Sequence, residues 1–286
     1  MRITKGDKYH KAILETILKE GTLDENPRAI YELSKEPANA LSINHVLMDY
    51  NLTKNESPLI TLRPIAVKKA IGEILWIYQD QSNDLDLLKD KYGVTWWDNW
   101  DIGDRTIGSC YGSTVKKYDL MNNLLKGLKE DPFGRRHIMS LWQEDDFKEP
   151  HALKPCCFMT TWNVRRGSDK KLYLDMILNI RSNDFMVAGC INQVQYLVLM
   201  HLVARHLGYE VGKFSVFVTN VQIYNAHFGI AKELLSRRSI ECEPKIWINP
   251  EKTNFYDFTL DDIKIINYPM EKIKQQNPQV KFELAV

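Results

Sequence analysis

The chain has 286 residues, of which 44% are hydrophobic and 26% are charged. This composition is typical of a globular protein and excludes a disordered or collagen-like chain. Because 38 Lys and Arg stand against 37 Asp and Glu, the formal net charge is only +1, and the sequence predicts no broad basic surface for nucleic acid. Any contact with an anion must therefore be local.

The N-terminus and the cysteines indicate the cellular setting. The segment Met1 to Gly6 lacks the apolar core of a secretory signal, and no apolar stretch approaches the roughly 18 residues of a membrane span. We therefore expect a cytoplasmic protein without a membrane partner. The cysteines are odd in number and form no CxxC pair, so we expect neither a disulfide framework nor a metal site. They are Cys110, Cys156, Cys157, Cys190 and Cys242.

Two helices and one loop are predicted before residue 80. Apolar residues at helical spacing predict a helix from Lys8 to Glu20, which a glycine follows. Residues 24–40 are polar and contain two prolines, which predicts a loop long enough to be functional; its only arginine is Arg28. A second helix is predicted from Ile65 to Tyr78, with Glu73 among its apolar residues.

Short runs rich in β-branched and aromatic residues occur in the second half and predict four strands of one sheet. They are Ile138 to Trp142, Phe158 to Val164, Leu172 to Ile180 and Phe214 to Thr219. Between the third and fourth runs, Asn192 to His206 is apolar on nearly every face, which predicts a centrally buried helix. No linker or repeat divides the chain, so we expect residues 1–286 to form one mixed α/β domain.

Cys156 follows Pro155 directly before a predicted strand, where a side chain can be held rigidly toward a cleft. Position alone favours a buried structural thiol, because free cysteine packs like a small hydrophobic residue. Nearby arginines favour a catalytic interpretation, because a guanidinium beside a thiol stabilises the reactive thiolate. Such arginines either bind phosphate or merely solvate the ends of strands. They are Arg135, Arg136, Arg165, Arg166 and Arg181.

Nine short stretches carry a resemblance that runs over nearly the whole chain. They are Glu73-Ile74-Leu75-Trp76, Trp97-Asp98-Asn99-Trp100, Tyr111-Gly112, Asp131 to Arg136, Leu153 to Cys156, Arg181 to Asp184, Asn192 with Gln195-Tyr196, Ile223 to His227, and Asn254 to Phe258. In order and spacing they resemble the thymidylate synthase family, particularly the form from low-GC Gram-positive bacteria and their phages. The resemblance implies an α+β fold in which helices flank a large mixed β-sheet.

The resemblance implies a reaction at C5 of dUMP. Cys156 would add to C6 of the uracil ring, and C5 would then take up the methylene carbon of the cosubstrate 5,10-methylenetetrahydrofolate, giving dTMP. Glu73 would work as acid and base through ordered water, with a pKa raised by burial; the alternative is an exposed helix glutamate. Asn192 would pair with uracil O4 and N3–H, which favours dUMP over dCMP. Tyr111 completes the implied catalytic set.

The resemblance also implies the binding residues and the assembly. The nucleotide would be held by Arg28, Arg181, Ser182, Asp184, Asn192, Gln222 and Tyr224, the last on the sugar 3′-hydroxyl. Two further nucleotide ligands, Arg135 and Arg136, would come from the other subunit of an obligate homodimer. The folate would contact Trp97 and Trp100, with Asp184 on its pterin. The C-terminal residue, Val286, would close over the bound ligands and exclude solvent.

Four positions depart from the usual family sequence. Residues 219–224 replace a Gly-Asp-x-His-x-Tyr element, so Gln222 stands in the place of a histidine and leaves sugar recognition open. Cys190, close to the ring-reading residue, is interpreted as a packing substitution. Cys157 replaces a histidine, and Gly134 replaces a phosphate-binding serine. Each loss removes a polar contact worth about 1–3 kcal/mol when its partner stays buried.

These departures leave two other functions open. In a dUMP hydroxymethylase, water instead of hydride quenches the exocyclic methylene intermediate, and the outcome depends on where one water stands near Trp97 and the C-terminus. In a noncatalytic relative, the chain would bind nucleotide or RNA as a regulator. Retention of Cys156 and Glu73 together with the phosphate arginines argues against the second function, because a binding protein needs no nucleophile.

Overall fold

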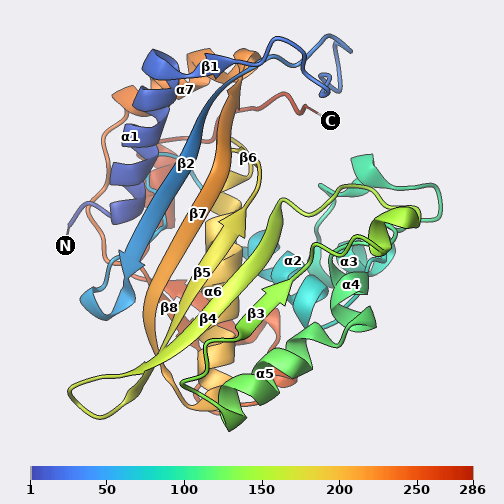
Figure 1. Cartoon of the computed structure of the whole chain (residues 1–286). Helices are drawn as coiled ribbons and strands as arrows, with labels where there is room; N and C mark the ends of the chain where they lie inside the picture. Colours follow the sequence, from blue (N-terminus) through green and yellow to red (C-terminus); the bar gives the residue numbers. More distant parts are fainter. Residues whose placement is uncertain (1, 286) are drawn as a thin grey trace.

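A computed structural model describes residues 2–285 of the chain (Figure 1). Its α-helices are α1 (Lys5–Glu20), α2 (Val67–Tyr78), α3 (Leu85–Tyr92), α4 (Gly112–Lys117), α5 (Leu120–Glu130), α6 (Gly189–Leu207), α7 (Phe228–Ser236) and α8 (Met270–Gln276). Its strands are β1 (Thr22–Leu23), β2 (Ala40–Asn51), β3 (His137–Ser140), β4 (Cys157–Arg166), β5 (Leu172–Ile180), β6 (Asn183–Asp184), β7 (Glu210–Tyr224), β8 (Lys245–Ile248) and β9 (Ile263–Ile266). Short 3-10 turns are η1 (Leu52–Lys54), η2 (Asp98–Trp100), η3 (Asp146–Lys148), η4 (Asn225–His227), η5 (Phe255–Asp257) and η6 (Leu260–Asp262).

One mixed sheet organises the molecule. Its strand order is β1-β2-β7-β5-β4-β3, and β6 pairs with the end of β7. β7 runs parallel to β5 and β6, and the other pairings in this sheet are antiparallel. β8 and β9 form a separate antiparallel pair. Figure 1 shows α2 and α6 behind the large sheet and α1 and α7 near the end where β1 lies. The expected large mixed sheet flanked by helices is confirmed.

The four predicted strands all belong to this sheet, but β2 was not predicted and β7 is longer than expected. On β7 the buried residues are even-numbered up to Val218 and odd-numbered from Val221. The change falls opposite His45 of β2, whose φ of 58° is unusual within a strand. The period of two is therefore interrupted in both strands, which explains why the predicted strand ended at Thr219.

The helices that the sequence predicted are present and bury their apolar faces. α6 is the central helix, with most of its residues buried, and it ends at Gly208 in the left-handed conformation. α2 is buried at every position from Ala70 to Tyr78, which places one carboxylate inside the protein. Gly21 ends α1 with extended backbone; a Cβ there would lie 2.4 Å from Ile17 O, so close packing requires this glycine. Within residues 2–285, no helix is long and apolar enough to span a bilayer.

Candidate active site

An apolar cavity of about 210 Å³ lies between α2, the N-terminal half of α6 and the segment before β4. Its polar lining groups are the Glu73 carboxyl, the Asn192 and Gln195 amides, and the thiol of Cys156. Aromatic rings form much of the remaining wall, from Trp96, Trp97, Trp100, Tyr111 and Tyr196. A planar ring would therefore meet a thiol, a carboxyl and an amide in one largely apolar space.

Glu73 is held by two indole rings. The Nε1–H of Trp97 donates to Oε1 at 3.0 Å, and the Nε1–H of Trp96 donates to Oε2 at 2.5 Å. The side chain is on α2, and the residue is only 7% exposed, so the exposed-glutamate alternative is wrong. Burial raises the pKa of Glu73 to about 7, against the opposing effects of the two indole donors and the Gln195 amide. A carboxyl with this pKa can both give and take a proton near neutral pH.

Cys156 is held from two directions. Its backbone N–H donates to the Tyr111 hydroxyl at 3.1 Å, and its carbonyl accepts from the backbone N–H of Arg181 at 3.0 Å. The Arg181 guanidinium donates to the carbonyls of Pro155 and Lys154, at 3.1 and 2.7 Å. The residue expected to bind phosphate therefore also orients the segment that carries the thiol.

The pKa of the Cys156 thiol is raised, although the nearby arginines alone would lower it. Burial raises the pKa of its thiol above the usual value, and the nearby Arg181 and Arg28 oppose this effect only in part. The arginines favour the thiolate, as expected, but desolvation outweighs them in the ligand-free chain. The thiolate must therefore form against burial when the reaction begins.

Tyr111 reaches the site through an unusual backbone conformation. It precedes α4 with a φ of 51° and a ψ of −111°, a region that a non-glycine residue adopts only under strain of about 1–3 kcal/mol. The next residue, Gly112, packs so closely that a Cβ would lie 2.0 Å from Ser82 O. This contact fixes the start of α4 and aims the Tyr111 hydroxyl at the Cys156 backbone.

Asn192 stands near the start of α6 with its amide already oriented. Its Oδ1 accepts from Asn183 Nδ2 at 3.2 Å, and its Nδ2 donates to Gln195 Oε1 at 3.0 Å. An amide oxygen has a second lone pair and an amide nitrogen has a second N–H. One acceptor and one donor on the same amide are therefore left for a ligand in the cavity.

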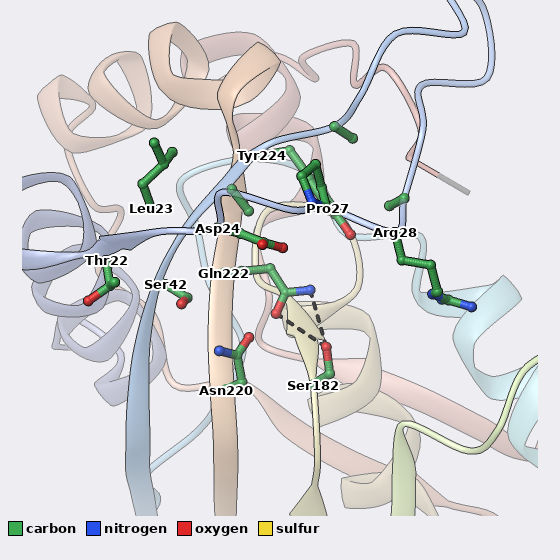
Figure 2. A pocket seen from close by; sticks show the side chains of 13 residues that line it. Thr22, Leu23, Asp24, Pro27, Arg28, Ser42, Ser182, Asn220, Gln222 and Tyr224 are labelled. Carbon is green, nitrogen blue, oxygen red and sulfur yellow. Dashed lines mark hydrogen bonds between the residues drawn. The ribbon is translucent and has the colours of Figure 1, made fainter.

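A second, polar cavity of about 400 Å³ lies between the loop after β1, the start of β2 and the end of β7, and Figure 2 shows its side chains. Gln222 and Ser182 face each other, with Gln222 Nε2 3.2 Å from Ser182 Oγ. Arg28 extends from the loop after β1 with an exposed side chain, and Tyr224 lies beside it in the lining. Ser182 lines this cavity and directly follows Arg181, whose backbone N–H donates to the Cys156 carbonyl, so one dipeptide links the polar lining to the segment that carries the thiol.

Several expected site residues do not line either cavity, and Arg181, whose guanidinium bonds the Pro155 and Lys154 carbonyls, is one of them. Arg135 and Arg136 are exposed just before β3. The Asp184 carboxylate accepts from the backbone N–H groups of Met186 and Val187, at 3.1 and 3.2 Å. Burial raises the pKa of Asp184, and His227 offsets part of that effect. Val286, expected to close the site, lies outside the described residues.

The structure adds residues that sequence reasoning missed. Trp96 bonds Glu73 directly, and its only signal was its position beside Trp97. Cys190 is buried, as a packing residue should be, but its sulfur also lies 3.0 Å from Nη2 of the buried Arg63. Arg63 donates in addition to Met186 O at 2.8 Å and so ties the chain before α6 in place.

The donors present suit organic substrates. Among residues 2–285 there is no group of three His, Cys, Asp or Glu side chains that could hold a metal ion. What the cavities combine is a thiol for covalent attack, a carboxyl that can exchange protons, and a guanidinium beside a polar space. Fold and site thus define a class of enzyme that carries out covalent chemistry on a planar ring bearing an anionic group.

Comparison with known proteins specifies the class. The thymidylate synthase family model matches residues 7–286. The thymidylate synthases of Streptococcus gordonii and Streptococcus pneumoniae are 46% identical over 286 residues, covering 99% of this chain and all of theirs. The solved structure of thermostable thymidylate synthase A from Bacillus subtilis matches with a TM-score of 0.87 and 36% identity, covering 98% of this chain and 99% of that one. The chain belongs to the thymidylate synthase family.

Proposed function

We propose that the protein methylates C5 of dUMP to give dTMP, with 5,10-methylenetetrahydrofolate as donor of both the carbon and the hydride. The observation that carries this proposal is that Cys156, Glu73 and Asn192 line one cavity in a chain related over its full length to thymidylate synthases. The hydroxymethylase alternative is not favoured, because the relatives named above are all thymidylate synthases.

Covalent attack by Cys156 starts the reaction. Its thiolate bonds to C6 of uracil, and the electrons of the C5=C6 bond move toward O4. C5 then bonds to the methylene carbon and loses its proton, and the bond between that carbon and the folate nitrogen breaks, leaving an exocyclic methylene on the ring. Hydride from the tetrahydrofolate adds to this methylene to give the methyl group, the C5=C6 bond re-forms, the S–C6 bond breaks to return the thiolate, and the folate leaves as dihydrofolate. The contacts of Tyr111 and Arg181 with this segment support the role of Cys156 by fixing its approach.

Glu73 and Asn192 have different tasks at the uracil ring. Glu73 exchanges protons with the ring through ordered water, which its pKa of about 7 supports. Asn192 accepts from N3–H and donates to O4, which the free lone pair and free N–H of its oriented amide support. One residue therefore moves protons, and the other selects uracil.

The polar cavity takes the sugar and phosphate. Arg28, Arg181 and Ser182 hold the phosphate; Arg28 and Ser182 line this cavity, and both guanidinium charges act on the Cys156 thiol, which supports this assignment. Tyr224 and Gln222 contact the sugar. Gln222 supplies a donor where relatives have histidine, and Ser182 already orients its amide.

The folate lies over the base in the aromatic cavity. Trp97 and Trp100, with ring centroids 5.6 Å apart, form a wall suited to a flat pterin. The contact of Asp184 with the pterin rests on the family resemblance alone. Leu284 lines the same cavity, and its carbonyl accepts from Glu32 N–H at 2.9 Å. This contact supports closure of the site by the C-terminus, with Val286 beyond it.

The active form is a homodimer in which Arg135 and Arg136 reach the partner's phosphate site. Two features support this assembly: both arginines are exposed beside edge strand β3, and the sheet face opposite α6 carries exposed apolar side chains. Leu47, Ile138 and Ile177, which are 56%, 55% and 40% exposed, lie on this face. No helix covers it in Figure 1, and a second copy of the chain would bury it.

The products distinguish the candidate functions. Incubation with dUMP and 5,10-methylenetetrahydrofolate is expected to give dTMP and dihydrofolate in equal amounts, identified by mass. Formation of 5-hydroxymethyl-dUMP with tetrahydrofolate would instead establish the hydroxymethylase. The absence of both products, with nucleotide still bound, would establish a noncatalytic binder.

Substitution of Asn192 tests how the base is selected. In Asn192→Asp the ionised carboxylate is acceptor-only, so it repels O4 of uracil but can accept from the 4-amino group of cytosine. The ratio of kcat/KM for dUMP to that for dCMP is expected to fall by about 10²-fold or more. Asn192→Ala is the control, since it removes both contacts and should weaken both substrates without reversing the preference. An unchanged ratio in Asn192→Asp would remove Asn192 from base recognition.

The sequence-based expectations of one domain and a cytoplasmic location are part of the same proposal. A hydrophobic core that runs from Ile13 on α1 to Ile263 on β9 supports one domain. Five free thiols, one of them the proposed nucleophile, suit a reducing compartment.

A further inference from the structure

Trp96 contacts the proposed proton-transfer group in the same way as its neighbour Trp97. The two indoles divide the Glu73 carboxyl between them, with Trp96 on Oε2 at 2.5 Å and Trp97 on Oε1 at 3.0 Å. We propose that Trp96 is a positioning residue that, with Trp97, fixes the orientation of Glu73 and favours its ionised form. This inference rests on the proposed function and assigns to Trp96 a part in that reaction.

The chemistry of the indole gives the contact its direction. An indole N–H is a donor only, so each of these bonds favours a negatively charged oxygen over a protonated one. Each carboxylate oxygen has a second lone pair that the indoles do not occupy. Because Glu73 lines the cavity, these remaining positions are where a proton can arrive from a bound ring or from ordered water. The two tryptophans therefore each occupy one position on the carboxylate, and proton exchange uses the positions that remain.

Burial and the indole pair have opposite effects on Glu73. Burial raises the pKa of the carboxyl to about 7, and the two indole donors, followed by the Gln195 amide, hold it lower than burial alone would. Without Trp96, the carboxyl would keep its desolvation but lose one of its two indole bonds. The removal of a donor destabilises the ionised form relative to the acid, so the pKa of Glu73 would rise.

The other titratable groups around Glu73 stay neutral at the pH at which Glu73 titrates. They face it from the segment before β4, from β4, from the start of α4 and from α6, and they are Cys156, Cys157, Tyr111 and Tyr196. Burial raises the pKa of each of them above its ordinary value. Within the described residues, no Lys, Arg or His side chain lines this cavity. A change in the pH profile near pH 7 that depends on Trp96 can therefore be assigned to Glu73.

The pH profile of Trp96→Phe tests the inference. Phenylalanine keeps an aromatic ring in the wall and removes the N–H. The limb of kcat/KM that titrates near pH 7 is expected to move to higher pH by about one unit, the effect of losing one hydrogen bond to a charged group. The phosphate of free dUMP also ionises near pH 6 and contributes to kcat/KM, but its contribution is the same for all variants and cancels in the comparison.

Trp100→Phe is the matched control. Trp100 lines the same cavity but makes no hydrogen bond to Glu73, so its variant can lose activity while the limb stays in place. Trp97→Phe should move the limb in the same direction as Trp96→Phe. The inference would be overturned if the kcat/KM limb of Trp96→Phe coincided with the limb of Trp100→Phe, or if it moved to lower pH.

A measurement on the unsubstituted protein keeps the inference testable if Trp96→Phe does not fold. With 15N-labelled tryptophan, the Trp96 indole N–H resonance is expected to shift with a midpoint near pH 7, and this shift should vanish in Glu73→Gln. A Trp96 resonance that does not respond to pH in the unsubstituted protein would contradict the bond. Neither spectrum requires turnover, so failure of the proposed methylation, seen as missing dTMP, is separate from failure of this inference.

Discussion

Cys156→Ser is expected to lower kcat by about 10³-fold or more, because a serine hydroxyl at this position is a far weaker nucleophile than a thiol. The substitution is nearly isosteric, and the contacts that hold the segment come from backbone atoms of residues 154–156, so the site should keep its shape. Formation of dTMP is the measurement, followed by mass under single-turnover conditions. Binding of dUMP, measured by calorimetry, should change far less than turnover.

Cys242→Ala is the matched control for this prediction. Cys242 is also a buried thiol, 4% exposed, but it lies outside both cavities of the site, so its loss should leave dTMP formation within a few-fold of the unsubstituted rate. Activity of Cys156→Ser within tenfold of the parent would exclude covalent attack by this residue. Loss of dUMP binding as large as the loss of turnover would point to a structural role instead.

The double variant Arg135→Ala, Arg136→Ala is expected to lose about 10²- to 10⁴-fold in kcat/KM. Each arginine would make a charge-assisted contact to phosphate worth about 1.5–3 kcal/mol, and every 1.4 kcal/mol corresponds to tenfold. The single chain places neither arginine in its own cavities, so the loss should come from the partner's site. Steady-state kinetics with dUMP at varied concentration measures it.

Co-expression of two inactive variants tests whether the sites are shared. When the double arginine variant is combined with Cys156→Ser, half of the dimers are mixed and each mixed dimer has one intact site, so activity should recover to about a quarter of the parent's. The control pair is Cys156→Ser with Glu73→Gln. Both lesions then affect residues that line the same chain's cavity, so no mixed dimer has an intact site. Equal recovery in the two pairs, or none in the first, would contradict sharing of Arg135 and Arg136.

The elements with an uninterrupted period were predictable from the sequence. β5 was predicted to its ends because its alternation persists along the whole strand. α6 was predicted nearly to its ends because it is apolar on all faces along its whole length. β2 was missed because the residues that pack on the core change from Leu41 and Ile43 to Val46, Met48 and Tyr50 at His45, where the backbone adopts a φ of 58°. Local pattern cannot reveal a strand whose two halves face the core with opposite sets of residues.

The site was predictable to the extent that single residues define it. Cys156, Glu73 and Asn192 were named from the sequence, and the fold brings them into one cavity although they are far apart along the chain. Arg181 was named for phosphate binding, but its hydrogen bonds to the carbonyls of residues 154 and 155 were not foreseen. A side chain with five donors can serve two partners, and only coordinates show which ones it reaches.

The sequence by itself determined the family and named Cys156, Glu73 and Asn192 as the proposed nucleophile, proton-transfer group and base-reading amide, because these inferences depend on residue type and order. The tertiary structure alone decided how the groups are tuned. Burial sets the pKa of Glu73 near 7 and raises that of Cys156 despite two arginines, and Trp96 bonds Glu73 from a separate segment. Desolvation and hydrogen-bond geometry depend on everything that packs around a group, and that packing exists only in the folded chain.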